Sequence, residues 1–62
     1  MAKPYTIGDT ILVTMPDRKV MRGKITDIKD GWIELENYAG FKSWINENQI
    51  IILKHVEEEH TS

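Results

Sequence analysis

The hydrophobic and polar positions along the chain follow the period-two pattern of β-strands, broken at short intervals by turn-forming residues. β-Branched and apolar residues fill positions 10–15, and a second run extends over positions 19–28. Ile33 and Leu35 alternate with polar neighbours, which predicts a third strand with one core face and one largely wet face. Positions 41–45 repeat this pattern. We therefore expect short strands throughout and no long helix.

Turn signals separate these runs. Residues 16–17, proline and aspartate, break the first run, and residues 37–40 supply the turn before the fourth. The Asp30-Gly31 pair is the clearest hairpin signal, because this dipeptide accepts the positive φ angles of tight hairpin turns. Gly23, inside the second run, predicts a sharp bend or a close backbone approach, and the broken alternation near Asp27 predicts a bend or bulge.

The most apolar stretch of the chain, at positions 50–53, does not alternate. A strand at these positions is apolar on both faces, so either Ile51 and Leu53 or Ile50 and Ile52 must point away from the core. Two aliphatic side chains on one outer face predict a buried contact with a second subunit. The natural contact is edge to edge, with this strand pairing with the fourth strand of a neighbouring copy. The expected interface residues are Trp44, Ile51, Ile52 and Leu53.

Five short strands joined by tight turns predict an all-β fold, a five-stranded, strongly bent small barrel with no substantial helix. We expect one domain over residues 10–55, preceded by a short leader at residues 1–9. Residues 56–62 are expected to form an acidic flexible C-terminal tail, because they lack apolar anchors.

Size and composition favour oligomerisation and exclude several other means of stabilisation. A domain of about 60 residues buries only roughly 60% of the surface of its unfolded chain, so its stability is marginal. The 62-residue chain has no cysteine, which excludes disulfides and cysteine-based zinc sites, and we expect neither a metal nor a cofactor. No segment approaches the length of a membrane span. We therefore expect a cytoplasmic homo-oligomer that does not contact a membrane.

Charge leaves the class of partner open. The net charge is −2, but without the acidic run at residues 57–59 the chain has eight basic and seven acidic residues. Five of the basic residues lie within twelve positions: Arg18, Lys19, Arg22, Lys24 and Lys29. This bias permits contact with nucleic acid, although a solvated strand face accounts for it more simply. The acidic run is interpreted as a solubilising tail or as a mimic of RNA.

The chain offers little for catalysis. Its two histidines, His55 and His60, lie near the end, and cysteine is absent, which removes the commonest catalytic triads. Acid pairs such as Asp27 and Asp30 flank a turn, where carboxylates are usually solvated. We expect no enzymatic activity.

Aromatic and amide side chains are the better candidates for binding. Trp32, Tyr38 and Trp44 can stack on bases, with nearby lysines on the phosphates, but tryptophan in so small a barrel also serves as packing bulk. Asn46 and Asn48 can read base edges or can satisfy local backbone groups in the turn. The residues alone favour the structural role for both asparagines and packing for Trp44.

Residues 11–53 resemble the Sm-like (LSm) family, which includes the bacterial Hfq-like RNA chaperones. The positions similar to the first family motif are Val13, the Asp17-Arg18 turn, Gly23, Ile25 and Asp30. Residues 45–50, followed by Ile52, are similar in spacing to the second motif, with Asn46 and Glu47 in place of an Arg-Gly pair.

The resemblance implies a ring of five-stranded barrels that binds single-stranded, often uridine-rich RNA without catalysis. The residues that would face a central pore are Lys29, Asp30, Trp32, Asn46 and Asn48. An SH3-like barrel is the alternative, because residues 5–9 opening into a strand and a short polar turn before the last strand are equally common there. Such a module would bind a protein partner or support an assembly, and would not contact nucleic acid.

Overall fold

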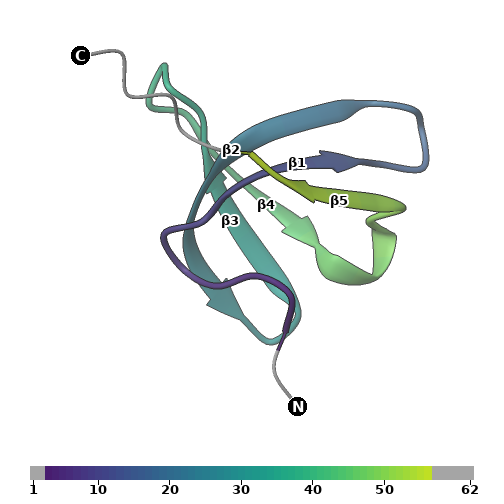
Figure 1. The fold of residues 1–62 in the computed structure, drawn as a ribbon, viewed down its shortest axis with the longest axis horizontal. Helices are drawn as coiled ribbons and strands as arrows, with labels where there is room; N and C mark the ends of the chain where they lie inside the picture. The colour runs from purple at the N-terminus through teal and green to yellow at the C-terminus, as the bar shows by residue number, and fades with distance from the viewer. Residues whose placement is uncertain (1–2, 57–62) are drawn as a thin grey trace.

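The computed structural model describes residues 3–56 and contains five antiparallel strands in one sheet (Figure 1). The spatial order of the strands across the sheet is β4-β3-β2-β1-β5. This arrangement confirms the all-β, five-stranded prediction. The elements are β1 (Thr10–Thr14), β2 (Val20–Lys29), β3 (Trp32–Glu36), β4 (Lys42–Asn46), the 3-10 turn η1 (Glu47–Gln49) and β5 (Ile52–His55).

The predicted turns are confirmed at all three hairpins. Asp30 and Gly31, both with positive φ angles of 51° and 84°, join β2 to β3. Arg18 takes a positive φ of 70° in the turn between β1 and β2. Between β3 and β4, the side-chain oxygen of Asn37 accepts hydrogen bonds from the backbone N–H groups of Ala39 and Phe41. Each turn thus supplies its own hydrogen bonds or glycine-like backbone geometry.

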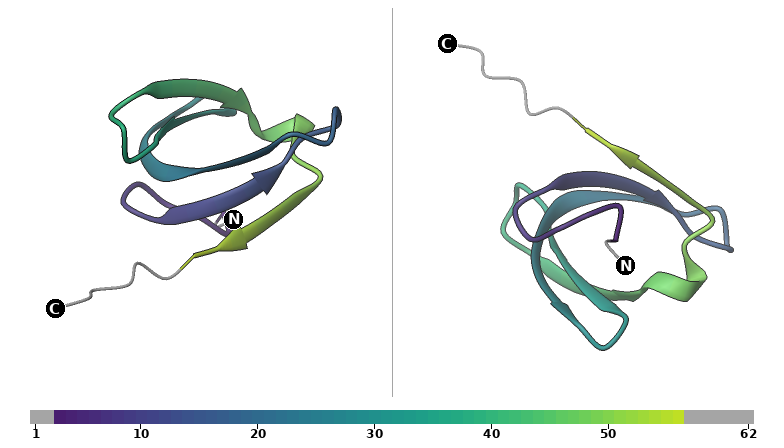
Figure 2. Two further views of the ribbon diagram at one scale, coloured as in Figure 1. Left: turned by 90° about the horizontal axis from the view of Figure 1, so that it is seen from above. Right: turned by 60° about the horizontal axis from the view of Figure 1, so that its bottom comes forward.

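The long strand β2 bends at the two places that the sequence indicated. The pairing register with β3 shifts between Ile25 and Asp27, which is the predicted bulge. A Cβ atom on Gly23 would lie 3.0 Å from the carbonyl oxygen of Glu36 and 3.2 Å from Cβ of Leu35. Glycine at this position therefore permits the close approach of β3 to β2, and the bend allows the sheet to curve around its core (Figure 2).

The core lies inside this curve and includes a residue from the expected leader. Its buried side chains are Tyr5, Ile11, Val13, Ile25, Ile33, Leu35 and Ile45. The purple N-terminal segment lies within the bend of the sheet in the right-hand view of Figure 2. Backbone hydrogen bonds hold it to β2, because Gly8 N–H donates to Ile25 O and Ile25 N–H donates to Asp9 O. The packed unit thus begins before residue 10.

The apolar run before the last strand divides differently from either expected pairing. Ile50 and Leu53 pack against the core, whereas Ile51 and Ile52 are 62% and 48% exposed. The expectation that residues 50–53 form one continuous strand was wrong, because η1 ends at Gln49 and a bend at Ile51 precedes β5, which begins at Ile52.

The sheet retains contact with the chain to the end of the described residues. β5 continues to His55, and the N–H of Val56 donates to the carbonyl of Thr10, so Val56 is held to the sheet rather than belonging to a tail. Residues 57–62 lie outside the described residues.

The sheet is strongly bent but not closed by hydrogen bonds between its first and last strands. Within residues 3–56, β4 and β5 each pair on one side only, β4 with β3 and β5 with β1. Two strand edges are therefore open. No helix in this part of the chain has the length and apolar character needed to cross a membrane.

Candidate nucleic-acid interface

Three of the residues predicted to bind RNA form one row across the outer face of the sheet. The register pairs Lys29 of β2 with Trp32 of β3, and Trp32 with Asn46 of β4. Paired residues in adjacent antiparallel strands project to the same face. Ile33 follows Trp32 in the sequence and Ile45 precedes Asn46, and both isoleucines are buried on the opposite face of the sheet. The row therefore points away from the core.

The turns that flank this row are joined by a backbone hydrogen bond. Glu47 N–H donates to the carbonyl of Gly31 at 2.8 Å, which fixes η1 against the β2–β3 turn. The predicted positions around Asp30 and Asn48 are consequently brought to the same end of the sheet. Asp30, exposed and with a positive φ angle, shapes the turn.

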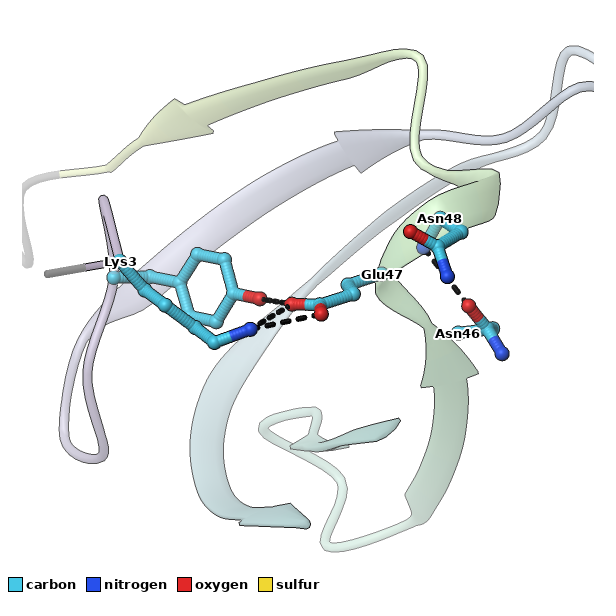
Figure 3. Close-up of polar contacts among 5 residues, drawn as sticks. Lys3, Asn46, Glu47 and Asn48 are labelled. Atoms are coloured by element: carbon cyan, nitrogen blue, oxygen red, sulfur yellow. Dashed lines mark hydrogen bonds and ion pairs between the residues drawn. The ribbon is translucent and has the colours of Figure 1, made fainter. Parts of the chain in front are cut away.

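Asn46 has a structural task in addition to its place in the row. Its Oδ1 accepts the backbone N–H of Asn48 at 2.8 Å and thereby caps η1 (Figure 3). This is the local backbone role that the sequence favoured. The NH₂ group of the same amide takes no part in the cap and can donate to a ligand.

Glu47 fastens the N-terminal segment to this end of the sheet (Figure 3). Lys3 Nζ donates to both carboxylate oxygens, at 2.7 Å and 2.8 Å, and the hydroxyl of Tyr5 donates to Oε1. These hydrogen bonds, from Lys3 first and then from Tyr5, lower the pKa of Glu47. Burial, together with the hydrogen bond to Glu47 and its negative charge, raises the pKa of Tyr5 to about 12.

Neither tryptophan belongs to the core. Trp32 and Trp44 are each 45% exposed, and the buried set consists of aliphatic residues and Tyr5. Trp44 lies opposite Glu34, whose carboxylate accepts a hydrogen bond from the hydroxyl of Thr26 at 2.9 Å. Trp44 and Trp32 are therefore diagonal neighbours on the outer face, where both are available for contact with a ligand or subunit.

The predicted interface residues lie on or next to the two open edges. Trp44 is on β4, and Ile52 begins β5, with exposed Ile51 directly before it. Leu53 differs from these, because it packs against the core and offers less surface to a partner.

Sequence reasoning missed the clasp formed by Lys3, Tyr5 and Glu47. Its members are separated by 42 and 44 positions, and no local pattern links them. The aromatic residue in the expected leader was the one available signal, since a tyrosine beside a short β-domain often buries its ring and retains a partner for its hydroxyl.

The described residues offer no cluster of three or more histidine, aspartate or glutamate side chains arranged to hold a metal ion. His55 is engaged structurally: its Nε2 donates to the carbonyl of Pro4 at 2.6 Å, and its Nδ1 lies 3.8 Å from a carboxylate oxygen of Asp9. The outer face carries aromatic rings, amide groups and ammonium groups, and also the carboxylates of Asp27, Glu34 and Glu36. The row at Trp32 itself combines a ring, an amide and an ammonium group, which suits recognition.

Comparison of the chain with models of protein families, with curated proteins and with solved structures finds no match.

Proposed function

We propose that the protein is a non-catalytic, homo-oligomeric module that binds single-stranded RNA. The observation that carries this proposal is the outward row formed by Lys29, Trp32 and Asn46 beside the two joined turns. An unpaired base has both faces of its ring and its hydrogen-bonding edge available, and this row presents a partner for each kind of contact.

Each of the three side chains would make a different kind of contact with RNA. The half-exposed ring of Trp32 serves as a stacking platform, a contact worth about 1–3 kcal/mol per base. Lys29 supplies positive charge for a phosphate, and the amide NH₂ of Asn46 donates to a base edge. The cap fixes the Asn46 side chain in advance, so little conformational freedom is lost on binding.

The acid at position 47 is compatible with a polyanionic ligand because its charge is compensated. Lys3 Nζ contacts both oxygens of the Glu47 carboxylate, and Tyr5 donates to the same group. A carboxylate paired in this way repels a phosphate less strongly than a free one. The clasp thus reduces the repulsion from Glu47, while Asp30 in the adjoining turn and the Asp27–Glu34 pair in the next row remain as negative charges near the site.

The open edges support assembly between copies. β4 carries Trp44 and β5 begins with Ile52, so pairing of β5 with β4 of a neighbour would bury exposed apolar surface and satisfy the edge backbone groups. Such a contact uses two different surfaces of each copy and is therefore head to tail. Repetition of a head-to-tail contact gives a ring when the rotation closes.

Native mass spectrometry with and without a uridine-rich oligonucleotide tests this function. We expect a closed oligomer that retains the oligonucleotide. The double variant Trp32→Ala, Asn46→Ser should keep the oligomer mass and lose the oligonucleotide, because serine preserves an acceptor for the cap while the stacking ring and the amide donor are gone. Phe41→Ala, which removes an exposed aromatic ring at the β3–β4 turn, is the matched control.

Two results would contradict the proposal. Unchanged RNA retention by the double variant would remove Trp32 and Asn46 from the site. A monomer that binds no oligonucleotide would favour the SH3-like alternative, a module for protein interaction or structural support.

A further inference from the structure

A second group of cations lies on the outer face, at the end of the sheet away from Trp32. The register pairs Thr10 with Lys24, Lys24 with Glu36, and Glu36 with Lys42, which forms a row across four strands. In the adjacent row, Leu12 lies between Arg22 of β2 and Lys54 of β5. The pairing of strands thus gathers basic residues that are scattered along the sequence.

A surface groove runs beside these rows. It is lined by Thr10, Arg22, Lys24, Glu36, Asn37 and Tyr38, together with backbone at Gly23 and Gly40. Tyr38 is fully exposed at the β3–β4 turn, so its ring forms an open wall of the groove. The Asn37 side chain holds that turn in place through its bonds to Ala39 and Phe41, which fixes the backbone that carries the ring.

The groove has an excess of positive charge. Among residues 3–56, no carboxylate lies within 4.0 Å of the Arg22 guanidinium or the Lys24 ammonium. The one acid that lines the groove, Glu36, lies between Lys24 and Lys42 in the register. The negative charge of Glu36 is thus compensated by a lysine on each neighbouring strand. Arg22 and Lys24 are exposed to solvent and are available to bind an anion.

We propose that this groove is a second binding site for single-stranded RNA, in which Arg22 and Lys24 hold phosphates and Tyr38 stacks on a base. The inference rests on the proposed function and extends the path of the same RNA strand. The guanidinium of arginine matches the geometry of a phosphate group. A fully exposed tyrosine ring can stack on a base only if that base is unstacked from its neighbours, and the bases of a duplex are not. Charge complementarity therefore combines with an aromatic surface at one place.

The two sites lie within reach of one strand of RNA. Trp32 and Glu36 are the two ends of β3, separated by four steps of about 3.3 Å each. Both sites lie on the outer face. A strand anchored by stacking on Trp32 can continue along β3 to the groove, with its phosphates turned away from the Glu34 carboxylate that lies between the two sites.

Salt dependence of binding separates phosphate contacts from stacking. Binding of a uridine-rich single strand should be measured over a series of salt concentrations for the wild type and for Arg22→Gln, Lys24→Gln. Loss of two phosphate contacts should lower the slope of log K against log salt by about 1.4, because each contact to single-stranded nucleic acid contributes about 0.7. Tyr38→Ala should weaken binding about tenfold with an unchanged slope.

The matched control removes the same charge elsewhere. Arg18→Gln, Lys19→Gln changes the β1–β2 turn at the other end of β1 and should leave the slope close to that of the wild type. An equal slope loss in this control would overturn the groove as a site, since it would reveal only an effect of net charge. A wild-type slope in Arg22→Gln, Lys24→Gln would also overturn it.

The outcome for the groove can be distinguished from the outcome for the first site. If Trp32→Ala, Asn46→Ser abolishes binding while the groove variants bind as the wild type does, the proposed function stands and the groove fails. If the groove variants lower the slope and Trp32→Ala, Asn46→Ser has no effect, the groove stands and the row at Trp32 fails. Equal affinity for a duplex of the same sequence would overturn the stacking role of Tyr38.

Discussion

The hydroxyl of Tyr5 donates a hydrogen bond to the carboxylate of Glu47, 42 positions further along the chain. The ring of Tyr5 is buried in the core, so one side chain both fills the barrel and fixes η1. The strength of the N-terminal attachment therefore depends on two separable contributions, burial of the ring and the polar contact at its tip.

Substitution of Tyr5 should separate these contributions. Tyr5→Ala removes a buried aromatic ring and should lower the free energy of unfolding by about 3 kcal/mol. Tyr5→Phe keeps the ring and loses the hydrogen bond, so its destabilisation should be clearly smaller. Urea unfolding followed by tryptophan fluorescence measures both. Equal stability of Tyr5→Ala and the wild type would show that the segment does not contribute to the core.

Alkaline pH should weaken the same attachment. The pKa of Tyr5 rises from 10.0 to about 12 on folding, because burial and the carboxylate of Glu47 disfavour the phenolate. The contribution to stability is complete below pH 10 and is lost as the pH rises toward about 12. In a Tyr38→Phe background, where Tyr5 is the sole tyrosine, phenolate absorbance should appear near pH 12 in the folded protein and near pH 10 in urea.

Acid pH should also weaken the attachment, through protonation of Glu47. The pKa of Glu47 lies below its ordinary value of 4.5, because the carboxylate accepts from Lys3 and Tyr5. Its contribution is complete above about pH 4.5 and is lost as the pH falls through the lower value of the folded state. Glu47→Gln should flatten this part of the stability profile. A profile that keeps its wild-type slope in this variant would exclude Glu47 as the responsible group.

Gly23 should tolerate no side chain without a loss of stability. In Gly23→Ala the new Cβ would lie 3.0 Å from the carbonyl oxygen of Glu36, so β2 and β3 must separate. We expect a loss of about 1–3 kcal/mol in the free energy of unfolding, as for other overpacked sites. Ser43→Ala, at an exposed position of β4, is the control and should remain within about 0.5 kcal/mol of the wild type. An unchanged midpoint for Gly23→Ala would contradict the close approach.

The open edges predict an oligomer that depends on Ile52. Ile52→Lys places a charge at the start of β5 and should raise the dissociation constant of the assembly at least about tenfold. Sedimentation across a range of protein concentrations measures this change. Ile7→Lys introduces the same charge at an exposed apolar position outside the strands and should leave the assembly intact. Equal effects of both variants would remove β5 from the interface.

The acidic run at the C-terminus should oppose RNA binding. Val56 is hydrogen-bonded to Thr10, which lines the basic groove, and three glutamates follow Val56 directly in the sequence. Replacing Glu57, Glu58 and Glu59 by glutamine should raise affinity for single-stranded RNA severalfold at low ionic strength, and salt should suppress the gain. Removal of residues 60–62 alone leaves the charges in place and should have little effect. Unchanged affinity in the glutamine variant would support a solubilising role only.

Local sequence patterns predicted most of the fold because strands and hairpin turns depend on near neighbours. Asp30-Gly31 determines its turn through backbone angles, and Gly23 marks the bend because a Cβ has no room there. The division of the apolar run at Ile51 was not predictable in the same way. It follows from where η1 ends, which depends on the hydrogen bond between Glu47 and Gly31 across the sheet.

The candidate site was predictable in composition but not in arrangement. Residue type and the resemblance to the Sm-like family suggested Trp32 and Asn46 as candidates, and the strand register pairs them directly on the outer face. The partners of Glu47 were not predictable, because Lys3 and Tyr5 reach it only once the chain has folded. The basic groove likewise depends on β1, β2 and β3 lying side by side.

The order of the strands also affects how this domain is made. β1 lies between β2, the next strand in the chain, and β5, the last strand. The contact between Tyr5 and Glu47 likewise joins residues that are 42 positions apart in the sequence. β1 and the N-terminal segment are therefore synthesised before the residues that complete their packing. β2, β3 and β4, in contrast, pair with strands that are their neighbours in the sequence. Until β5 is released, one edge of β1 lacks its hydrogen-bonding partner. Chaperones that recognise exposed strand edges have their best opportunity to bind in this interval.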